Sequence, residues 1–330
     1  MIAHNAVDTG SKDTAWLESN AGVINEVNAV ASALEKLKID YHIESIRSIG
    51  HLADVLKSRK EKIVFNLIEE LPANIIEACY VPAICRAHGK ACTGSDTPAL
   101  ILAQNKWHTK AVLKAAGLPC PAGAIIPPNK TMRPGQLPAG KYIVKPVSSD
   151  ASEGIDASSI VNIPGNTIHK NISRIHKQFR QPALVEQFIQ NREFNVAILQ
   201  QNSAVNVLPI AEIDFSAFDK NTPRIIDYSA KWLPESFAFN NTPRVIPAKL
   251  PAVTAKLMRQ YALGAWHAAG CRDYVRVDFR MGKNQQPFII EINPNPDITP
   301  DDGFSVALTA AGISYEKFIE TILQNASQTR

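Results

Sequence analysis

The spacing of strand-like and helix-like segments changes along this chain, and that change most constrains its fold. Over residues 1–96 helical and strand-like patterns alternate, which predicts a parallel sheet with helices on both faces. A helix is expected over residues 99–117, followed by a loop rich in proline and glycine over residues 118–140. Strand-like segments then follow one another closely, which favours antiparallel sheets in α+β units. We expect three units, over residues 1–96, 97–185 and 186–330.

A predicted hairpin near the end of the chain gathers polar side chains. Its strands, YVRVDFR (274–280) and PFIIEIN (287–293), flank a turn that contains glycine and asparagine. We expect Arg276 to pair with Glu291. Side-chain alternation in that register puts four polar residues on one face: Arg276, Asp278, Glu291 and Asn293. Carboxylate and amide oxygens suit Mg²⁺, which usually shares its shell with phosphate oxygens, so the hairpin predicts a magnesium site. The alternative is a pair of solvated surface acids.

Basic residues elsewhere could hold the phosphates of a nucleotide. Lys106 and Lys110 lie one helical turn apart, and Lys145 ends a strand that runs into VSSDASEGI. Backbone N–H groups and hydroxyls of such a loop can bind phosphate oxygens. Glu186 and Glu193 could accept hydrogen bonds from an exocyclic amine and from ribose hydroxyls. The chain has neither a Walker A motif nor a GxGxxG fingerprint, so neither of those binding modes is expected.

Composition excludes several classes of protein. The net charge of +4 is spread along 330 residues without a basic run, which argues against nucleic-acid binding. No apolar stretch reaches the length of a membrane helix and no signal peptide is recognisable, so we expect a cytoplasmic protein without a membrane partner. The five cysteines show no metal-binding spacing, and we interpret them as reduced packing residues.

The order of six segments resembles the ATP-grasp superfamily, in particular its D-alanine:D-alanine ligase group. The segments are NKWHTKAVLKAAGLPCP, YIVKPVSSDASEGI, LVEQFIQNREFNVAIL, IIDYSAKW, CRDYVRVDFR and IIEINPNP. VFNLIEE and TGSDTPALILAQNK are similar to the first domain of that group, so the resemblance covers nearly the whole chain. It implies α/β and α+β architecture: an ATP-grasp fold in which an N-terminal Rossmann-like domain precedes two lobes that sandwich ATP.

The resemblance also implies roles for individual residues. The expected ATP-binding residues are Lys106, Lys145, Ser152, Gly154, Glu186, Gln187, Ile189, Glu193 and Lys231. The expected magnesium ligands are Asp278, Glu291 and Asn293. The expected catalytic residues are Arg276, Lys231 and Ser152. The expected substrate contacts are Glu69, Tyr228 and Asp302.

The activity implied by the resemblance is the joining of a carboxylate to an amine. The carboxylate attacks the γ-phosphate of ATP, and the resulting acyl phosphate is attacked by the amine, with release of ADP and phosphate. Arg276 and nearby N–H groups would stabilise the tetrahedral oxyanion. Dimers are common in the resembled group, so a homodimer is a further expectation.

Departures from the group's pattern concern the substrates. Glu69 and Glu70 stand where a loop rich in histidine and glycine is usual, and the expected acid of the first helix aligns with Ala21. Asp302 replaces a serine that usually holds the acceptor's carboxylate, and an aspartate there could instead receive an ammonium group. We therefore expect substrates other than two D-alanines. The alternatives are a true D-alanine:D-alanine ligase, a carboxylase acting on bicarbonate, and a catalytically silent ATP-binding sensor or partner protein.

Overall fold

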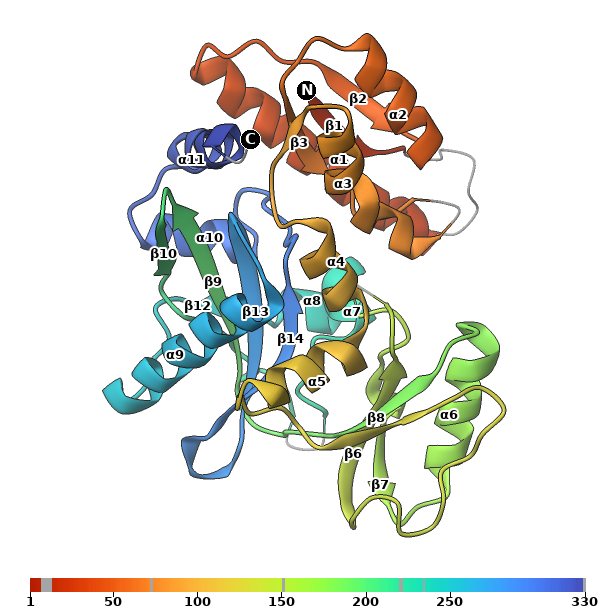
Figure 1. Ribbon diagram of the computed structural model, residues 1–330. Helices are drawn as coiled ribbons and strands as arrows, with labels where there is room; N and C mark the ends of the chain where they lie inside the picture. The colour runs from red at the N-terminus through yellow and green to blue at the C-terminus, as the bar shows by residue number, and fades with distance from the viewer. Residues whose placement is uncertain (7–13, 72–73, 150–151, 220–221, 234, 329–330) are drawn as a thin grey trace.

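The computed structural model contains three sheets, each with its own helices (Figure 1). It describes residues 1–6, 14–71, 74–149, 152–219, 222–233 and 235–328. Within these ranges, every helix is too short or too polar to cross a lipid bilayer. All five cysteines are free thiols, and four of them are buried.

The first sheet is parallel and has four strands in the order β2-β1-β3-β4. Its strands are β1 (Ile2–Asn5), β2 (Ile43–Ile46), β3 (Ile63–Leu67) and β4 (Ala91–Cys92). The helices that accompany it are α1 (Thr14–Lys36), α2 (Ile49–Ser58) and α3 (Val81–Ala87), with a 3₁₀ turn at Ile75–Tyr80. The strands β1 and β3 are almost wholly buried, as expected for a parallel sheet covered by helices. The alternation predicted for the N-terminal part is confirmed.

The helix expected over residues 99–117 is in fact two helices, α4 (Thr97–Gln104) and α5 (Lys106–Ala115). Asn105 lies between them with extended backbone, and its side chain accepts hydrogen bonds from the N–H groups of Trp107 and His108. The prediction of one helix was wrong because an asparagine that caps a new helix looks like a tolerated polar residue inside a continuous one.

A smaller antiparallel sheet follows, with the order β5-β8-β6-β7. Its strands are β5 (Gly123–Ile126), β6 (Gly140–Pro146), β7 (Ile160–Ile163) and β8 (Ala183–Gln187). Helix α6 (Thr167–Gln178) packs on this sheet through Ile168, Ile172 and Ile175, whose spacing of three and four residues puts them on one helix face.

The third sheet is the largest, with the order β12-β11-β9-β13-β14 and β10 paired to β9. Its strands are β9 (Glu193–Gln201), β10 (Ala204–Val207), β11 (Ala211–Ile213), β12 (Arg244–Val245), β13 (Tyr274–Met281) and β14 (Pro287–Asn293). Its helices are α7 (Tyr228–Trp232), α8 (Phe237–Asn240), α9 (Ala252–Ala269), α10 (Gly303–Ala310) and α11 (Tyr315–Gln328). The helix α9 packs on this sheet together with α5 and ends at Gly270, whose φ of 65° is left-handed.

The register of the β13–β14 hairpin differs from the one expected. Arg276 lies opposite Asn293 and Asp278 opposite Glu291, and the register shifts immediately after Asp278. Ile290 is left without a partner there, and this single extra residue moves the pairing by one position. The pairing therefore differs from the expected one by two positions from Arg276 to Asp278 and by one position from Phe279 onward. Over Arg276–Asp278 a shift of two leaves each side chain on the face expected for it, and all four polar residues line one cavity.

The ends of the chain come together in one core. The C-terminal helix α11 packs against α1 and β3, and the cluster of buried residues there also includes side chains of β9, β13 and α10. We propose the three units expected from the sequence, with the second ending at Gln187 because β8 completes the small sheet.

Candidate active site

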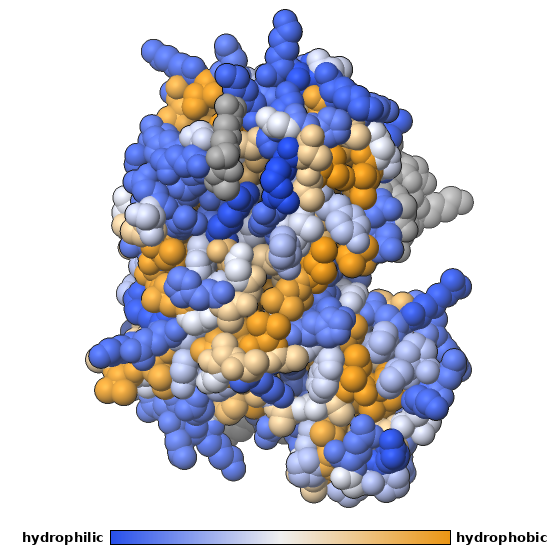
Figure 2. Space-filling model, viewed as in Figure 1, coloured by the Kyte–Doolittle hydropathy of each residue, from blue (hydrophilic) through white to orange (hydrophobic). Residues whose placement is uncertain are grey.

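A cavity of about 1020 Å³ lies where the three sheets meet. Its wall includes residues of α1 and of the loop after β3. Residues of the small sheet and of the strands β13 and β14 also line it. In the space-filling view the outline narrows between the N-terminal unit and the lobe that carries α6 (Figure 2). Each of the three units therefore contributes residues to the wall of the cavity.

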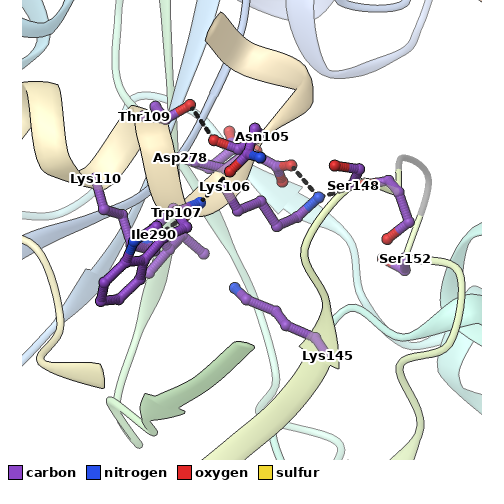
Figure 3. Close-up of polar contacts among 12 residues, drawn as sticks. Asn105, Lys106, Trp107, Thr109, Lys110, Lys145, Ser148, Ser152, Asp278 and Ile290 are labelled. Carbon is purple, nitrogen blue, oxygen red and sulfur yellow. Dashed lines mark hydrogen bonds and ion pairs between the residues drawn. The ribbon is translucent and has the colours of Figure 1, made fainter. Parts of the chain in front are cut away.

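Two lysines enter the cavity from different elements (Figure 3). Lys106 opens helix α5, and its ammonium group donates to the carbonyl of Ser149 and lies 3.5 Å from Glu291 Oε1. Lys145 comes from β6, and its ammonium group lies 3.1 Å from Glu186 Oε1. Both side chains are almost fully buried, so their charges are poorly screened by water.

Glu186 is held by two lysines at once. Its Oε2 lies 2.7 Å from the ammonium group of Lys110, in addition to the contact with Lys145. Burial raises the pKa of Glu186, but the two lysines outweigh it and the net shift is downward. The prediction that Glu186 meets the adenine edge stays a prediction, and Gln187 and Ile189 beside it also line the cavity.

Glu193, expected at the ribose, lies at the start of β9 and lines the cavity. Arg280 donates to its Oε2 at 2.7 Å and to the carbonyl of Ile189 at 2.5 Å. Burial raises the pKa of Glu193 more strongly than Arg280 lowers it. Arg280 of β13 thus contacts both Glu193, expected at the ribose, and Ile189, expected at the adenine.

Each charged residue of the hairpin lies close to a group of opposite charge. Arg276 makes two hydrogen bonds to Asp278, at 2.8 and 3.0 Å, and Asn195 of β9 donates to the same carboxylate at 2.7 Å. Burial opposes the ionisation of Glu291, but Lys106 and then Lys231 lower its pKa to about 2. Glu291 is therefore an anion at neutral pH.

The donor set at the end of β14 fits a hard divalent cation. Asp278 and Glu291 lie opposite each other and supply carboxylate oxygens, while Asn293 supplies an amide oxygen. No group of three or more His, Cys, Asp or Glu residues that could hold a metal occurs among the described residues. A set of two carboxylates and one amide is typical of Mg²⁺ that completes its shell with water and phosphate oxygens.

The loop after β6 presents Ser152 to the cavity. Its backbone has a φ of 63°, and its hydroxyl donates to the carbonyl of Ile226 at 2.8 Å. Gly154 also has a positive φ, of 70°, and a Cβ there would lie 2.7 Å from the ring of Phe179. Gly154 is thus required by the packing of the loop, and Ser152 rather than Gly154 is among the described lining residues.

Of the three expected substrate residues, the described cavity wall includes two. Glu69 and Asp302 line the cavity, whereas Tyr228, in α7, is not among the described residues of its wall. Asp302 Oδ1 forms an ion pair of 2.9 Å with Arg244 of β12. The carboxylate that we expected to receive an ammonium group thus already has a cationic partner.

Several residues of the cavity wall were missed by sequence reasoning. Arg280 and Asn195 lie in segments that carry the resemblance but were assigned no role, and Arg244 comes from a strand without a motif. The sheet order brings all three to the site. Glu26 and Asp297 also line the cavity. Glu26 carried a detectable signal, since it is a charged residue on the otherwise apolar face of α1.

Comparisons with known proteins decide the family. The family model described as D-ala D-ala ligase C-terminus matches residues 135–324. The chain belongs to the D-alanine–D-alanine ligase family. This member is a ligase that uses ATP, and its fold is the ATP-grasp fold. The family predicted from six short segments is therefore confirmed.

Individual relatives are distant from this family member. A protein of Sinorhizobium fredii named uncharacterized protein y4sG is 31% identical over 273 residues, covering 82% of this chain and 76% of the relative. The D-alanine–D-alanine ligase of Erythrobacter litoralis is 27% identical over 314 residues, 94% of this chain and 90% of that enzyme. A crystal structure of D-alanine–D-alanine ligase from Bacillus anthracis complexed with ATP superposes with a TM-score of 0.74 over 99% of this chain and 97% of that one, at 19% identity. At that identity the superposition shows the shared fold.

Proposed function

We propose that this family member joins a carboxylate to an amine through an acyl phosphate, on amino-acid-like substrates other than two D-alanines. The observation that carries the proposal is the convergence of Lys106, Lys145 and Lys231 with Glu291 and Asp278 in one buried cavity. These residues supply cations for a triphosphate and anions for the metal that accompanies it.

The lysines would hold the phosphates of ATP. Lys106 and Lys145 enter from α5 and β6, so phosphates between them would be gripped from two elements. In the ligand-free state their charges are matched by Glu291 and Glu186, and phosphate oxygens would take over part of that role. The hydroxyl of Ser152 and nearby N–H groups add donors on the loop side.

Asp278, Glu291 and Asn293 are the residues that would hold Mg²⁺. When bound, the ion would supply positive charge to the transferring phosphoryl group. Because Glu291 ionises with a pKa of about 2, it is already deprotonated for this role at neutral pH.

Arg276 would stabilise the oxyanion that forms when the amine attacks. Two of its N–H groups are committed to Asp278, which fixes the plane of the guanidinium group. Arg276 is also one of the residues that line the cavity. A preorganised donor of this kind typically contributes about 3 kcal/mol to transition-state stabilisation.

The substrate part of the proposal depends on the wall around Asp302. A serine at this position can donate to a carboxylate, whereas the Asp302–Arg244 ion pair offers a different pattern of charge. The acceptor site therefore has a chemistry unlike the one implied by the resemblance. Homodimer formation stays a prediction, which light scattering would test.

The experiment measures ADP release with ATP and Mg²⁺ over pairs of amino acids and amines, with mass spectrometry of the products. We expect an amide product from at least one pair, and no ADP above background with D-alanine alone. Robust turnover of D-alanine would refute the substrate part and favour a true D-alanine:D-alanine ligase. ATP binding without ADP release over the whole panel would favour the silent sensor.

The Glu291→Gln variant tests the metal assignment. Replacing a charged ligand by a neutral one is expected to reduce the rate of ADP release about 100-fold or more, since metal-ion charge contributes several kcal/mol to phosphoryl transfer. The matched control is Glu320→Gln on α11, whose carboxylate pairs with Lys317 outside the cavity. Equal turnover by the Glu291 variant and the wild type would contradict the assignment.

A further inference from the structure

A buried carboxylate on β8 lies between two ammonium groups. Glu186 Oε2 lies 2.7 Å from Lys110 Nζ, and Glu186 Oε1 lies 3.1 Å from Lys145 Nζ. Figure 3 shows that Lys110 and Lys145 come from different elements, α5 and β6. All three side chains are almost fully buried, so water screens their charges poorly. Two cations on one carboxylate leave this cluster with a net positive charge.

The two lysines differ in what they face. Lys145 and Glu186 line the cavity, whereas Lys110 is not among the described residues of its wall. Lys110 is held instead by a hydrogen bond of 3.0 Å to the carbonyl of Ile290 on β14. Lys145 also acts on Glu291, whose pKa it helps to lower. Lys110 is therefore fixed outside the cavity wall, while Lys145 lies where a ligand can contact it.

Binding of a triphosphate would change the balance of charge around Glu186. A phosphate oxygen that takes Lys145 removes one of the two counter-ions of that carboxylate. A buried carboxylate without a cation is strongly unfavourable, so it would either retain Lys145 or take up a proton. With Lys110 in place, Glu186 keeps a cation at 2.7 Å when Lys145 leaves. The second lysine thus makes the first one available to a ligand.

We propose that Lys110 is a positioning residue for ATP: it holds Glu186 as a fixed anion, so that Lys145 can turn to the phosphates while Glu186 accepts a hydrogen bond from the amino group of adenine. The inference rests on the proposed function and assigns a role in its ATP site to a residue outside the cavity wall. Each carboxylate oxygen can accept two hydrogen bonds, so Glu186 has acceptor capacity left beside its lysine.

The pKa of Glu186 agrees with this division of roles. Burial acts to raise that pKa, Lys110 opposes burial more strongly than Lys145 does, and the net shift is downward. In the loop after α5, the nearby Cys120 thiol adds no charge at neutral pH, because burial raises its pKa. Without Lys110, the pKa of Glu186 would rise whenever Lys145 moves to a phosphate. ATP binding would then be coupled to the uptake of a proton.

Calorimetric titration of ATP with Mg²⁺, without a carboxylate or an amine, tests the proposal. Titrations in buffers of different ionisation enthalpy count the protons exchanged on binding, and the difference between variant and wild type cancels the protons of the nucleotide. We expect Lys110→Met to take up more protons than the wild type and to bind ATP about tenfold more weakly or worse at pH 8. Because its bound state holds the extra proton, its affinity relative to the wild type should fall from pH 6 to pH 8.

A lysine of the same helix provides the matched control. Lys114 lies one turn beyond Lys110 in α5 and is exposed, so Lys114→Met should bind ATP and exchange protons as the wild type does. Equal proton uptake by Lys110→Met and the wild type would overturn the proposal even if the variant bound ATP more weakly, because weaker binding alone fits a structural role.

The preference for ATP over ITP is a second readout. The base of ITP presents an oxygen where adenine presents its amino group, and an ionised Glu186 disfavours that oxygen. We expect the wild type to prefer ATP about tenfold or more. Lys110→Met and Glu186→Gln should both prefer it less, because a protonated carboxyl or an amide can donate to the oxygen. An unchanged preference in Glu186→Gln would overturn the proposal.

The double variant Lys110→Met/Glu186→Gln shows whether Lys110 acts through Glu186. It has no carboxyl group to protonate there, so the extra proton uptake of Lys110→Met should disappear. Its affinity for ATP should lie within about twofold of that of Glu186→Gln. Binding about tenfold weaker than that would give Lys110 a nucleotide contact of its own and overturn the proposal. This comparison decides the matter if circular dichroism shows that Lys110→Met is unfolded.

These titrations are independent of turnover. If the ADP-release screen gives no product while proton uptake follows the expected pattern, the proposed function fails and the role of Lys110 stands. If ADP is released but Lys110→Met binds ATP without extra proton uptake, the role of Lys110 fails and the ligase stands. Absence of ATP binding by the wild type would refute both.

Discussion

At the scale of single residues, burial and nearby charge compete to set how a carboxylate ionises. Glu291 is surrounded by lysines, and its pKa falls to about 2 despite burial. Asp273 has the opposite balance, because burial raises its pKa to about 6 although Arg272 and the N–H of Gly94 oppose the shift. The carboxylates of Asp273, just before β13, and Glu291, in β14, thus differ by about four pKa units because of their surroundings.

The Asp273→Asn variant tests this account through stability. The pKa of Asp273 is raised in the folded state, from 3.8 to about 6. Between these values the unfolded chain loses its proton first, so ionisation of Asp273 lowers the free energy of unfolding as the pH rises. Asparagine has no such ionisation and tolerates the φ of 61° found there. The difference in unfolding free energy, variant minus wild type, should therefore increase by about 2 kcal/mol from pH 4 to pH 7.

Urea unfolding at several pH values measures this difference. The comparison with the wild type cancels the contributions of the other acids, which titrate alike in both proteins. A difference that stays constant from pH 4 to pH 7 would show that Asp273 ionises normally.

At the scale of elements, the break between α4 and α5 determines the positions of Lys106 and Lys110 in the site. Because α5 begins anew at Lys106, that residue lies in the first turn and reaches Ser149 and Glu291. Lys110 lies one turn further on, where it contacts Glu186 and the carbonyl of Ile290. The N-cap at Asn105 therefore determines where both ammonium groups enter the site.

The Asn105→Ala variant removes that cap. The N–H groups of Trp107 and His108 lose their acceptor, which is expected to lower the free energy of unfolding by about 1 kcal/mol. We also expect weaker ATP binding, because the first turn of α5 holds Lys106. Urea unfolding and calorimetric titration of ATP measure the two effects. Asn105→Asp retains a capping oxygen and is the control, and equal ATP affinity in the alanine variant would show that the cap does not position the lysine.

At the scale of the whole molecule, α11 connects the N-terminal unit to the large sheet. Phe318 of α11 is fully buried, with its ring 5.5 Å from that of Tyr274 on β13 and 5.4 Å from that of Phe304 on α10. The same cluster includes Val27 of α1 and Phe65 of β3. The N-terminal unit and the unit of the large sheet thus share one apolar core.

Truncation of that aromatic side chain should destabilise the protein as a whole. We expect Phe318→Ala to lower the free energy of unfolding by about 3 to 5 kcal/mol, the usual cost of removing a buried phenylalanine ring. Phe237→Ala is the matched control, since that ring is 57% exposed, and its effect should be below about 1 kcal/mol. Equal midpoints of chemical unfolding for the two variants would show that α11 contributes little to the core.

The sequence by itself determined the architecture, the family and the face of the hairpin. Periodicity and segment order predicted these correctly because they depend on local patterns of apolar residues and on alternation along a strand. The expected register was wrong, but the predicted face of Asp278 and Glu291 was still right. Residues two positions apart on a strand share a face, and the pairing at Asp278 differs by two positions.

Only the tertiary structure decided which charges meet. Arg244 forms an ion pair with Asp302, 58 positions away in the chain, and Asp297 helps to raise the pKa of Glu26, 271 positions away. No local pattern records such pairs, because they depend on how α1, β12 and the loop after β14 pack around one cavity. Segments that are far apart in the sequence contribute the charges of the substrate site. Their net charge can therefore be determined only from the folded structure.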